Sequence, residues 1–301
     1  MNFFQRIFLV GVLLVLPDNL LMAQRLGPHD VDELPTTKPT VVQKYGADPM
    51  QFGELRVPKG EGPFPVAVVI HGGCWTKGFA TLQNTAAMAS ELATHNIATW
   101  NVEYRQVGDA GGGWPGTFRD WGAAVDYVRV LAKSYPLDIS NVVVMGHSAG
   151  AHAALWVAAR HCLPGNSEIR GADPLPVQGA VAIDGPGDLA GFVGFDAQVC
   201  GLPVVAPLMG GTPKEQPERY RQASPQSLLP LGVPQYLVSA SVLTPDKAQE
   251  YQKLAQAKGD HAEVLALKSG HFEVIAPGQK AWAAVEETIL NTAFKAKPSG
   301  K

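Results

Sequence analysis

Short apolar runs alternate with longer helical patterns from residue 41 to the end of the chain. Runs rich in β-branched residues indicate strands buried on both faces, expected at 65–70, 97–102, 141–146, 179–183, 235–239 and 262–267. Between them the sequence predicts helices at 117–135, 149–160, 245–258 and 279–294. Strands that alternate with helices in this way predict an α/β fold, with a mainly parallel central sheet and helices on both faces.

Two segments interrupt this alternation and set the expected domain limits. Residues 24–40 are rich in Pro, Asp and Thr and are expected to form a leader or linker. One domain should then occupy 41–295, followed by a tail at 296–301. Within the domain, residues 185–230 have weak periodicity and many Gly and Pro residues. Such a segment indicates a cap-like insertion over a site.

The N-terminus has the pattern of an export signal. Arg6 precedes an apolar run at 7–16, and Ala23 offers a small residue for cleavage just before Gln24. A run of this length is short for a bilayer span but suits a signal peptide, expected at 1–23. An uncleaved anchor is the alternative. The chain is therefore expected to be exported, to the periplasm or secreted, with no stable membrane span after processing.

Composition narrows the classes of protein that fit. The 301 residues are 46% hydrophobic and 17% charged, as in a globular protein. The formal net charge of −3 argues against a broad basic surface for nucleic acid. Nothing in the composition indicates an oligomeric state.

Three cysteines are present, and their spacing forms no CxxC motif or Cys/His cluster, so no metal site is expected. In an oxidising compartment two of them can form a disulfide. Cys74 lies in a motif with a separate role, so Cys162 with Cys200 is the preferred pair. Three free thiols are the alternative.

The residues Gly146-His147-Ser148-Ala149-Gly150 match the pattern G-x-S-x-G. They follow a predicted buried strand and open a predicted helix, which is the structural context that this motif needs. A sharp turn there lifts the Ser148 hydroxyl clear of the backbone. The helix that begins after it directs N–H groups at developing negative charge. We therefore predict Ser148 as a nucleophile, and the flanking histidines, His147 and His152, as scaffold.

A second glycine-rich turn, His71-Gly72-Gly73-Cys74-Trp75, follows the strand at 65–70. Its glycines let the backbone approach a substrate closely. The N–H groups of Gly73 and Cys74, with that of Ala149, are predicted to form an oxyanion hole. Its order ahead of the serine motif supports this interpretation.

A serine nucleophile needs a general base, and His271 has the best position. It follows the last predicted strand, in Ser269-Gly270-His271-Phe272, late in the chain. The order serine, acid, histidine is that of α/β hydrolases.

The acid is less well defined by the sequence. The loop after the strand at 235–239 has no carboxylate in its early positions. Asp246 lies further along and is the preferred acid, although it also suits the first turn of a helix. Asp188 and Asp184, which follow the preceding strand, are alternatives, and so is a Ser–His dyad without an acid.

These residues resemble the esterase, lipase and arylformamidase-like branch of the α/β hydrolases. The resemblance covers about 41–294 and rests on motifs in the family's order: Tyr45-Gly46, His71-Gly72-Gly73-x-Trp75, Tyr104-Arg105, Trp114-Pro115, Asp120, Gly146-His147-Ser148-Ala149-Gly150, Ala223-Ser224-Pro225 and Gly270-His271-Phe272. It implies an α/β-hydrolase fold and a serine mechanism. Related sequences include acetyl and feruloyl esterases, lipase-like enzymes and formamidases, and the branch usually carries an Asp in the loop that here reads 239–244.

Taken together, the sequence predicts a serine hydrolase that cleaves small-molecule carboxylic esters through an acyl-enzyme on Ser148. The alternatives are an amide hydrolase of the arylformamidase type and a non-catalytic binding module on a hydrolase fold. No cofactor is expected. Trp75 and Trp114 are candidates for the substrate pocket, and Arg105 with Asp120 for a structural ion pair.

Overall fold

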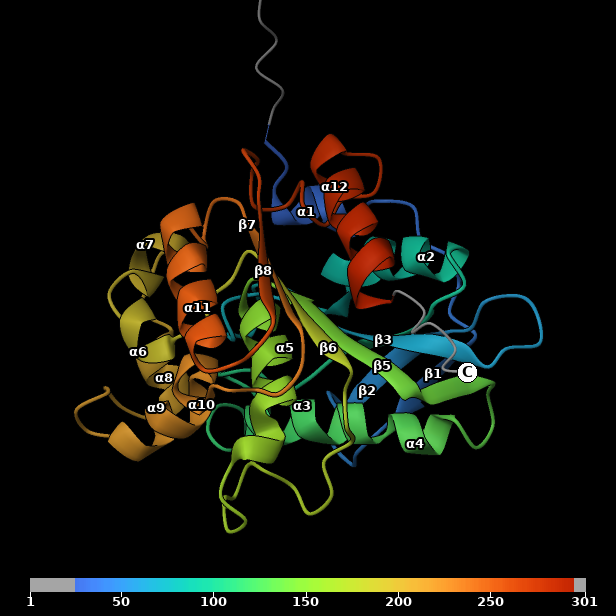
Figure 1. Ribbon diagram of the computed structural model, residues 1–301. Helices are drawn as coiled ribbons and strands as arrows, with labels where there is room; N and C mark the ends of the chain where they lie inside the picture. The colour runs from blue at the N-terminus through green and yellow to red at the C-terminus, as the bar shows by residue number, and fades with distance from the viewer. Residues whose placement is uncertain (1–24, 295–301) are drawn as a thin grey trace, which may run out of the picture.

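The computed structural model describes residues 25–294, which fold around one eight-stranded sheet (Figure 1). The strand order is β1-β2-β4-β3-β5-β6-β7-β8. β1 and β2 are antiparallel to their neighbours, and all other pairs are parallel. The strands are β1 (Val41–Lys44), β2 (Phe52–Arg56), β3 (Phe64–Ile70), β4 (Ala98–Val102), β5 (Leu137–His147), β6 (Gly179–Ile183), β7 (Gln235–Ser239) and β8 (Ala262–Ala266).

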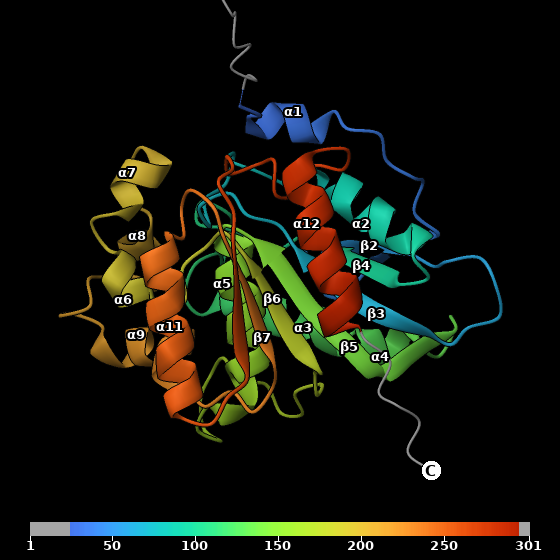
Figure 2. The same ribbon diagram turned by 45° about the horizontal axis from the view of Figure 1, so that its top comes forward.

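Helices cover both faces of this sheet, as Figures 1 and 2 show from two angles. On one face lie α1 (Pro28–Asp32), η1 (Leu82–Thr85), α2 (Ala86–Thr94), α12 (Lys280–Thr288) and the π-helix η3 (Ile289–Ala293). On the other face lie α3 (Gly116–Asp126), α4 (Val128–Leu131), α5 (Ala149–Ala159), η2 (Arg160–Cys162) and α11 (Pro245–Ala257). The predicted fold class is confirmed.

The continuous apolar runs are explained by the two cores that this arrangement creates. Along β3, Val66 and Val68 join the core beneath α3 and α5, whereas Ala67 and Val69 join the core beneath α2 and α12. All four side chains are fully buried. A strand buried on both faces needs apolar residues at every position and shows no alternation.

The sequence patterns missed several elements, among them β1, β2 and α2, and merged others. β1 and β2 form the antiparallel edge, where half-exposed positions weaken the apolar pattern. α2 begins with small residues that give little periodic signal. The helix expected at 117–135 is divided at Tyr127 into α3 and α4.

The described part of the expected leader, residues 25–40, packs on the domain. It contains α1, whose Val31 is buried in the core beneath α2. Asn84 donates to the carbonyl of Pro28 and to the carboxylate of Asp32, and the amide of Thr37 donates to Ser90 Oγ. The predicted signal peptide at 1–23 lies outside the described residues, so export stays a prediction. Among residues 25–294, no helix is both long and apolar enough to cross a bilayer.

The insertion predicted at 185–230, here called the cap, joins β6 to β7. It consists of short helices on the side of the sheet that also carries α11 (Figure 1). They are α6 (Leu189–Phe192), α7 (Asp196–Cys200), α8 (Val205–Met209), α9 (Pro217–Ala223) and α10 (Pro225–Leu228).

Candidate active site

Ser148 occupies the turn between β5 and α5, in a backbone conformation that side chains rarely adopt. Its φ is 57° and its ψ is −119°. A Cβ on Gly146 would lie 2.2 Å from the carbonyl oxygen of Gly150, so this crowded turn excludes a side chain there. A strained serine at a strand-to-helix turn has the geometry predicted for a nucleophile, with its hydroxyl presented at the top of a parallel sheet.

The backbone of Ser148 is tied to the neighbouring strand. Its amide donates to the carbonyl of Ile183, the last residue of β6, at 2.8 Å. The next residue, Asp184, has a φ of 51° and is fully buried. The chain therefore brings a carboxylate to the edge of the sheet beside the nucleophile turn.

The Asp184 carboxylate is held by a ring of backbone amides. The N–H groups of the four consecutive residues 240–243 donate to it at 2.9–3.1 Å, and Ser241 Oγ lies 3.3 Å away. Burial opposes the charged form, but the hydrogen bond and charge of His271, followed by the amides of Leu243 and Ser241, lower the pKa of Asp184 to about 2. The loop after β7 has no acid of its own, but its amides bind the carboxylate of Asp184, which directly follows β6.

His271 pairs with this carboxylate. Its Nδ1 lies 2.7 Å from Asp184 Oδ2. Our preferred acid, Asp246, is an exposed residue in the first turn of α11. Asp188 is also engaged elsewhere, because it caps α6 by accepting from the amides of Ala190 and Gly191. The partner of His271 is therefore Asp184, which corrects the preference for Asp246.

His147 contacts the loop that carries His271. The Nε2 of His147 lies 2.8 Å from the carbonyl oxygen of His271, and the two rings are 4.2 Å apart between centroids. Burial, and then the neighbouring His271, lower the pKa of His147 to about 3. A carbonyl only accepts, so Nε2 of the neutral ring carries the proton. His147 thereby fixes the backbone of His271 next to Ser148.

The turn at residues 71–75, here called the oxyanion loop, lies against the nucleophile. A Cβ on Gly72 would be 2.9 Å from Ser148 Cβ, so only glycine permits this approach. Gly73 and Cys74 both have positive φ, at 96° and 52°. Within residues 25–294, their N–H groups donate to no protein acceptor, and they remain available to a ligand.

Buried polar groups support the first half of this loop. The hydroxyl of Tyr104 lies 3.0 and 3.2 Å from the carbonyl oxygens of His71 and Gly72. His71 Nε2 lies 2.8 Å from a carboxylate oxygen of Glu103, which also accepts from the amide of Leu82. These bonds fix the direction in which the loop presents its amides.

The disulfide pairing predicted from the sequence is wrong. Cys74 of the oxyanion loop is bonded to Cys200 at the end of α7, with Cα atoms 6.2 Å apart. Cys162 is a free, exposed thiol near the carbonyl of Pro230. The cap folds back over the oxyanion loop, and this places the end of α7 beside Cys74 rather than beside Cys162.

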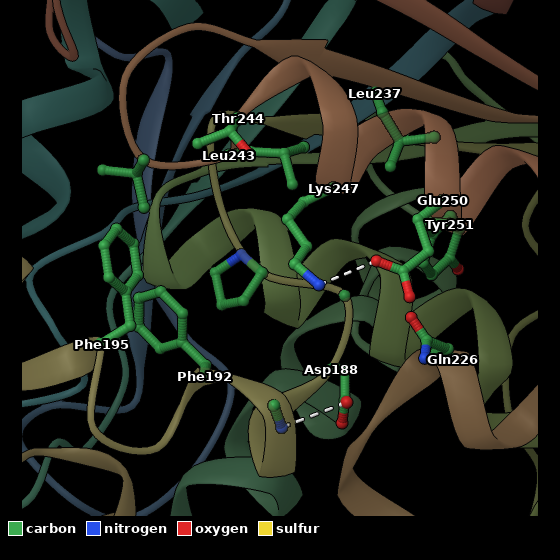
Figure 3. A pocket seen from close by; sticks show the side chains of 14 residues that line it. Asp188, Phe192, Phe195, Gln226, Leu237, Leu243, Thr244, Lys247, Glu250 and Tyr251 are labelled. Atoms are coloured by element: carbon green, nitrogen blue, oxygen red, sulfur yellow. Dashed lines mark hydrogen bonds and ion pairs between the residues drawn. The ribbon is translucent and has the colours of Figure 1, made fainter.

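A pocket of about 410 Å³ opens between the cap and α11 (Figure 3). Its walls are mainly apolar, and Lys247 extends across it toward Glu250, where the charged groups are 2.8 Å apart. The lining residues are Pro186, Gly187, Asp188, Gly191, Phe192, Phe195, Gln226, Leu237, Val242, Leu243, Thr244, Lys247, Glu250 and Tyr251.

This pocket is bounded on one side by the loop that holds Asp184 and on the other by a cap residue that contacts the oxyanion loop. Val242 and Leu243 line it with their side chains while their amides hold Asp184. On the cap side, the ring of Phe192 packs edge-on against Trp75, with centroids 6.2 Å apart.

Neither predicted substrate-pocket tryptophan lines this cavity. Trp75 is buried in the core and reaches the pocket only through Phe192. The indole N–H of Trp114 donates to Glu168, and the guanidinium of Arg219 lies 5.6 Å from its ring centre. Trp114 therefore joins the cap to the body of the domain.

Comparison with known proteins places this site in a family. The BD-FAE family model matches residues 55–240, which is more than half of the chain. The chain belongs to the BD-FAE family of α/β-hydrolase esterases. The predicted resemblance is therefore confirmed. The matched region contains Ser148 and Asp184, and His271 follows it.

Relatives of this BD-FAE chain carry esterase names. It is 27% identical over 205 residues to esterase LipC of Mycobacterium tuberculosis (strain ATCC 25618 / H37Rv), covering 64% of this chain and 48% of LipC. It is 28% identical over 111 residues to a probable isoprenylcysteine alpha-carbonyl methylesterase of Arabidopsis thaliana, covering 36% of this chain and 22% of that protein. The chain thus spans about half of the first relative and about a fifth of the second.

Solved structures share the fold at low identity. A truncated carbohydrate esterase from gut microbiota has a TM-score of 0.70 and 18% identity, covering 86% of this chain and 98% of that one. Esterase B from Lactobacillus rhamnosis also has a TM-score of 0.70 and 18% identity, covering 88% of this chain and 89% of that one. Identity at this level supports the fold alone.

One group in the described part of this BD-FAE chain has the side chains of a metal site. Glu91 and His95 on α2 lie near Glu286 on α12, with His95 Nε2 3.3 Å from a Glu286 oxygen. These residues pack on the sheet face opposite α5 and are partly exposed. A side-chain contact between His95 and Glu286 accounts for this grouping without a metal. The predicted ion pair of Arg105 with Asp120 is present as well, at 2.6 Å.

The sequence predicted His147 as scaffold and placed Tyr104 in a family motif, but it assigned no role to Glu103. Glu103, Tyr104 and His147 act through contacts between strands that are distant in the sequence. For the acid, the sequence carried one local signal. Asp184 directly follows a buried strand and precedes Gly185, and it lies opposite a loop rich in small residues.

His152 is a fully buried residue in the first turn and a half of α5, just after Ser148. We expect it to make the stability of the protein depend on pH. Burial lowers its pKa to about 4, whereas an unfolded histidine has a pKa of about 6.5. The unfolded chain therefore binds more protons than the folded chain between these values, and stability falls as pH drops through that window. We expect His152 to account for a loss of about 2 kcal/mol in the free energy of unfolding between pH 7 and pH 5.

Urea unfolding of wild type and His152→Gln at both pH values measures this effect. Gln retains a donor for the carbonyl of Ala223, which His152 Nε2 contacts at 2.8 Å. The variant should lose less stability between pH 7 and pH 5 than the wild type. An equal loss in both proteins contradicts the assignment, whatever their absolute stabilities.

Proposed function

We propose that this chain hydrolyses carboxylic esters through an acyl-enzyme on Ser148. The observation that carries the proposal is the contact of 2.7 Å between His271 Nδ1 and Asp184, beside the strained turn of Ser148. His147 and Ile183 bind the backbones of His271 and Ser148 at this point. A hydroxyl, an imidazole and a carboxylate in this order are the parts of a serine hydrolase.

In the first half of the reaction, Ser148 Oγ attacks the ester carbonyl while His271 Nε2 accepts the hydroxyl proton. Asp184 holds the Nδ1–H of His271 and stabilises the imidazolium that forms. The carbonyl oxygen becomes an anion that the amides of Gly73, Cys74 and Ala149 bind. Each such donor is worth about 3 kcal/mol in the transition state.

The intermediate then collapses, and the bond to the alcohol oxygen breaks. His271 returns its proton to that oxygen, the alcohol leaves, and the acyl group remains on Ser148. A water molecule attacks the acyl-enzyme with His271 again as base. The carboxylic acid departs and the Ser148 hydroxyl is restored.

The names of the relatives support an ester substrate over an amide. The test compares initial rates on p-nitrophenyl acetate and N-formylkynurenine under identical conditions. Turnover of the acetate with little or no turnover of the formamide supports the proposal. The reverse result identifies an arylformamidase-type enzyme, and no turnover of either by folded protein across pH identifies a non-catalytic module.

The pocket between the cap and α11 is proposed to receive the apolar part of the ester. The chain passes from the turn at Ser148 to this pocket, because Gly185, whose Cβ would lie 2.0 Å from the carbonyl oxygen of Ser148, is followed by the lining residue Pro186. Cavities of a few hundred Å³ with apolar walls suit small organic groups.

Val242→Phe is expected to fill this pocket while leaving the amide that binds Asp184 in place. We expect kcat/KM to fall about tenfold for an ester with a long apolar chain, because added side-chain volume excludes several methylenes. Acetate esters should change less than twofold. Series of p-nitrophenyl acyl esters and of alkyl acetates show whether the pocket takes the acyl or the alcohol chain.

Val130→Phe is the matched control, because Val130 is an exposed residue of α4. It should change neither series. If Val242→Phe also leaves both chain-length series unchanged, the pocket does not bind this part of the substrate.

A further inference from the structure

We propose that Cys200 is a positioning residue for the oxyanion loop, and that the oxidised Cys74–Cys200 form is the fully active form. The disulfide anchors the middle of that loop to the cap. This inference rests on the proposed function, because it assigns the amides of the loop to the oxyanion hole.

The oxyanion loop needs support from outside, because its own backbone is strained. Cys74 and Trp75 both have positive φ, at 52° and 54°, directly after Gly73. A non-glycine residue in this region costs on the order of 1–3 kcal/mol and persists only when its surroundings enforce it. Without enforcement the amides of Gly73 and Cys74 would turn away.

Hydrogen bonds secure the loop at its two ends. Tyr104 contacts the carbonyls of His71 and Gly72. Beyond the loop, the amide of Val107 donates to the carbonyl of Trp75 at 2.8 Å.

Between these ends, Cys74 is supported in three ways. Thr76 Oγ1 donates to its carbonyl at 2.9 Å, its side chain packs partly against the core, and the disulfide joins it to Cys200. The disulfide is its covalent link to the cap. It therefore decides how firmly the central amide is held.

The other end of the disulfide is a firm anchor. Cys200 is the last residue of α7, and Asp196 in the first turn of that helix is buried. The Asp196 carboxylate accepts from the amides of Gly194, Ala197, Val204 and Val205 at 2.8–2.9 Å. These bonds fasten α7 to the chain before it and to the start of α8.

The bond thus links two segments 126 residues apart in the sequence, one from the oxyanion loop and one from the cap. It prevents the cap from separating from the loop. Phe192 and Phe195, which line the pocket, belong to the same stretch of cap. One covalent bond therefore sets both the oxyanion amides and one wall of the pocket.

Reduction by a dithiol such as dithiothreitol tests this directly. The reagent gives up two electrons and two protons and becomes a cyclic disulfide, while Cys74 and Cys200 become two thiols. Losing one oxyanion donor lowers kcat about 10²–10³-fold in other serine hydrolases. Because reduction loosens a donor without removing it, we expect kcat to fall about tenfold.

The experiment measures kcat and KM on p-nitrophenyl acetate for Cys200→Ser, Cys74→Ser and the double variant. Both single variants should lose about tenfold in kcat with KM changed less than twofold, and the double variant should lose no more. Wild type treated with dithiothreitol should show the same loss and recover on reoxidation. Cys162→Ser, which removes the free exposed thiol, should behave as wild type in both states.

Loss of stability alone would not move these values. A disulfide with a purely structural role lowers the melting temperature of Cys200→Ser but leaves kcat unchanged well below that temperature, and this result overturns the inference. Peptide mapping of unreduced protein without a Cys74–Cys200 linkage also overturns it. If wild type and Cys162→Ser fail to cleave any ester, the proposed function itself has failed. If the variants misfold, dithiothreitol treatment of folded wild type decides.

Discussion

Replacing Ser148 with Ala is expected to lower kcat for p-nitrophenyl acetate by about 10⁵–10⁶-fold. The variant has no oxygen that can form the acyl-enzyme, while the oxyanion loop and the pocket remain. KM should change little, because Ser148 is not needed to bind the ester. Steady-state rates and covalent labelling by a fluorophosphonate probe measure the effect, and the probe should label wild type and spare the variant.

Two further variants make this result specific. Ser148→Gly removes the hydroxyl and relaxes the positive φ, so it shows whether backbone strain at an alanine contributes to the loss. Ser140→Ala changes an exposed serine at the other end of β5 and should keep full activity. Activity of Ser148→Ala within tenfold of wild type rules out the acyl-enzyme.

Replacing Asp184 with Asn is expected to lower kcat by about 10⁴-fold. The carboxylate holds the proton of His271 on Nδ1 and leaves Nε2 free to act as the base. An amide lacks the negative charge that stabilises the imidazolium, and its NH₂ group is a donor that cannot accept from the N–H groups of residues 240–243. Rates on p-nitrophenyl acetate near pH 8 measure the loss.

Asp246→Asn is the matched control for this prediction, because Asp246 is exposed at the start of α11. It should retain activity within twofold. The opposite pattern, with activity lost in Asp246→Asn and kept in Asp184→Asn, contradicts the assignment of the acid. Circular dichroism and thermal melting of Asp184→Asn show whether the loss precedes unfolding.

The low pKa of Asp184 has a second consequence. Its folded value of about 2 lies below the value of about 3.9 in an unfolded chain. Its contribution to stability is therefore complete above about pH 4 and disappears as pH falls through 2. Across the neutral range the acid stays charged, so its protonation does not limit the rate there.

The parts of the site that the sequence predicted are those that depend on short stretches of chain. Ser148, the glycines of the oxyanion loop and His271 each follow a recognisable strand, and a buried parallel strand has a strong apolar pattern. In a parallel sheet the carboxyl ends of strands meet at one edge. The order of the motifs was therefore enough to predict that these residues lie together.

The acid and the disulfide depend on contacts across the fold, and the sequence could not decide them. Asp184 and residues 240–243 lie at the ends of neighbouring strands, and the preference for Asp246 assumed that the acid follows β7. Cys74 was excluded from pairing because it had another role in the oxyanion loop. In the structure Cys74 belongs to the oxyanion loop and is also bonded to Cys200, because the cap returns to this loop.

The sequence predicted well the strands that are buried on both faces of the sheet. It predicted poorly the elements that are buried on one face only. β4, β6 and β7 are buried throughout, as are most of β3 and the second half of β5, and these stretches were found within a few residues. β1, β2 and α1 lie at the edge or surface, where tertiary contacts such as those of Val31 and Asn84 determine the structure. Local patterns carry little information about such contacts.

In the loop after β7, the main chain and the side chains make separate contacts. Its amides serve the acid, and amides are the same for every residue except proline. Its side chains at Val242, Leu243 and Thr244 face the pocket and have no part in holding Asp184. Substitutions at these three positions are therefore expected to change the substrate selectivity of the pocket without moving the amides that hold Asp184. The three positions form a suitable set for saturation mutagenesis.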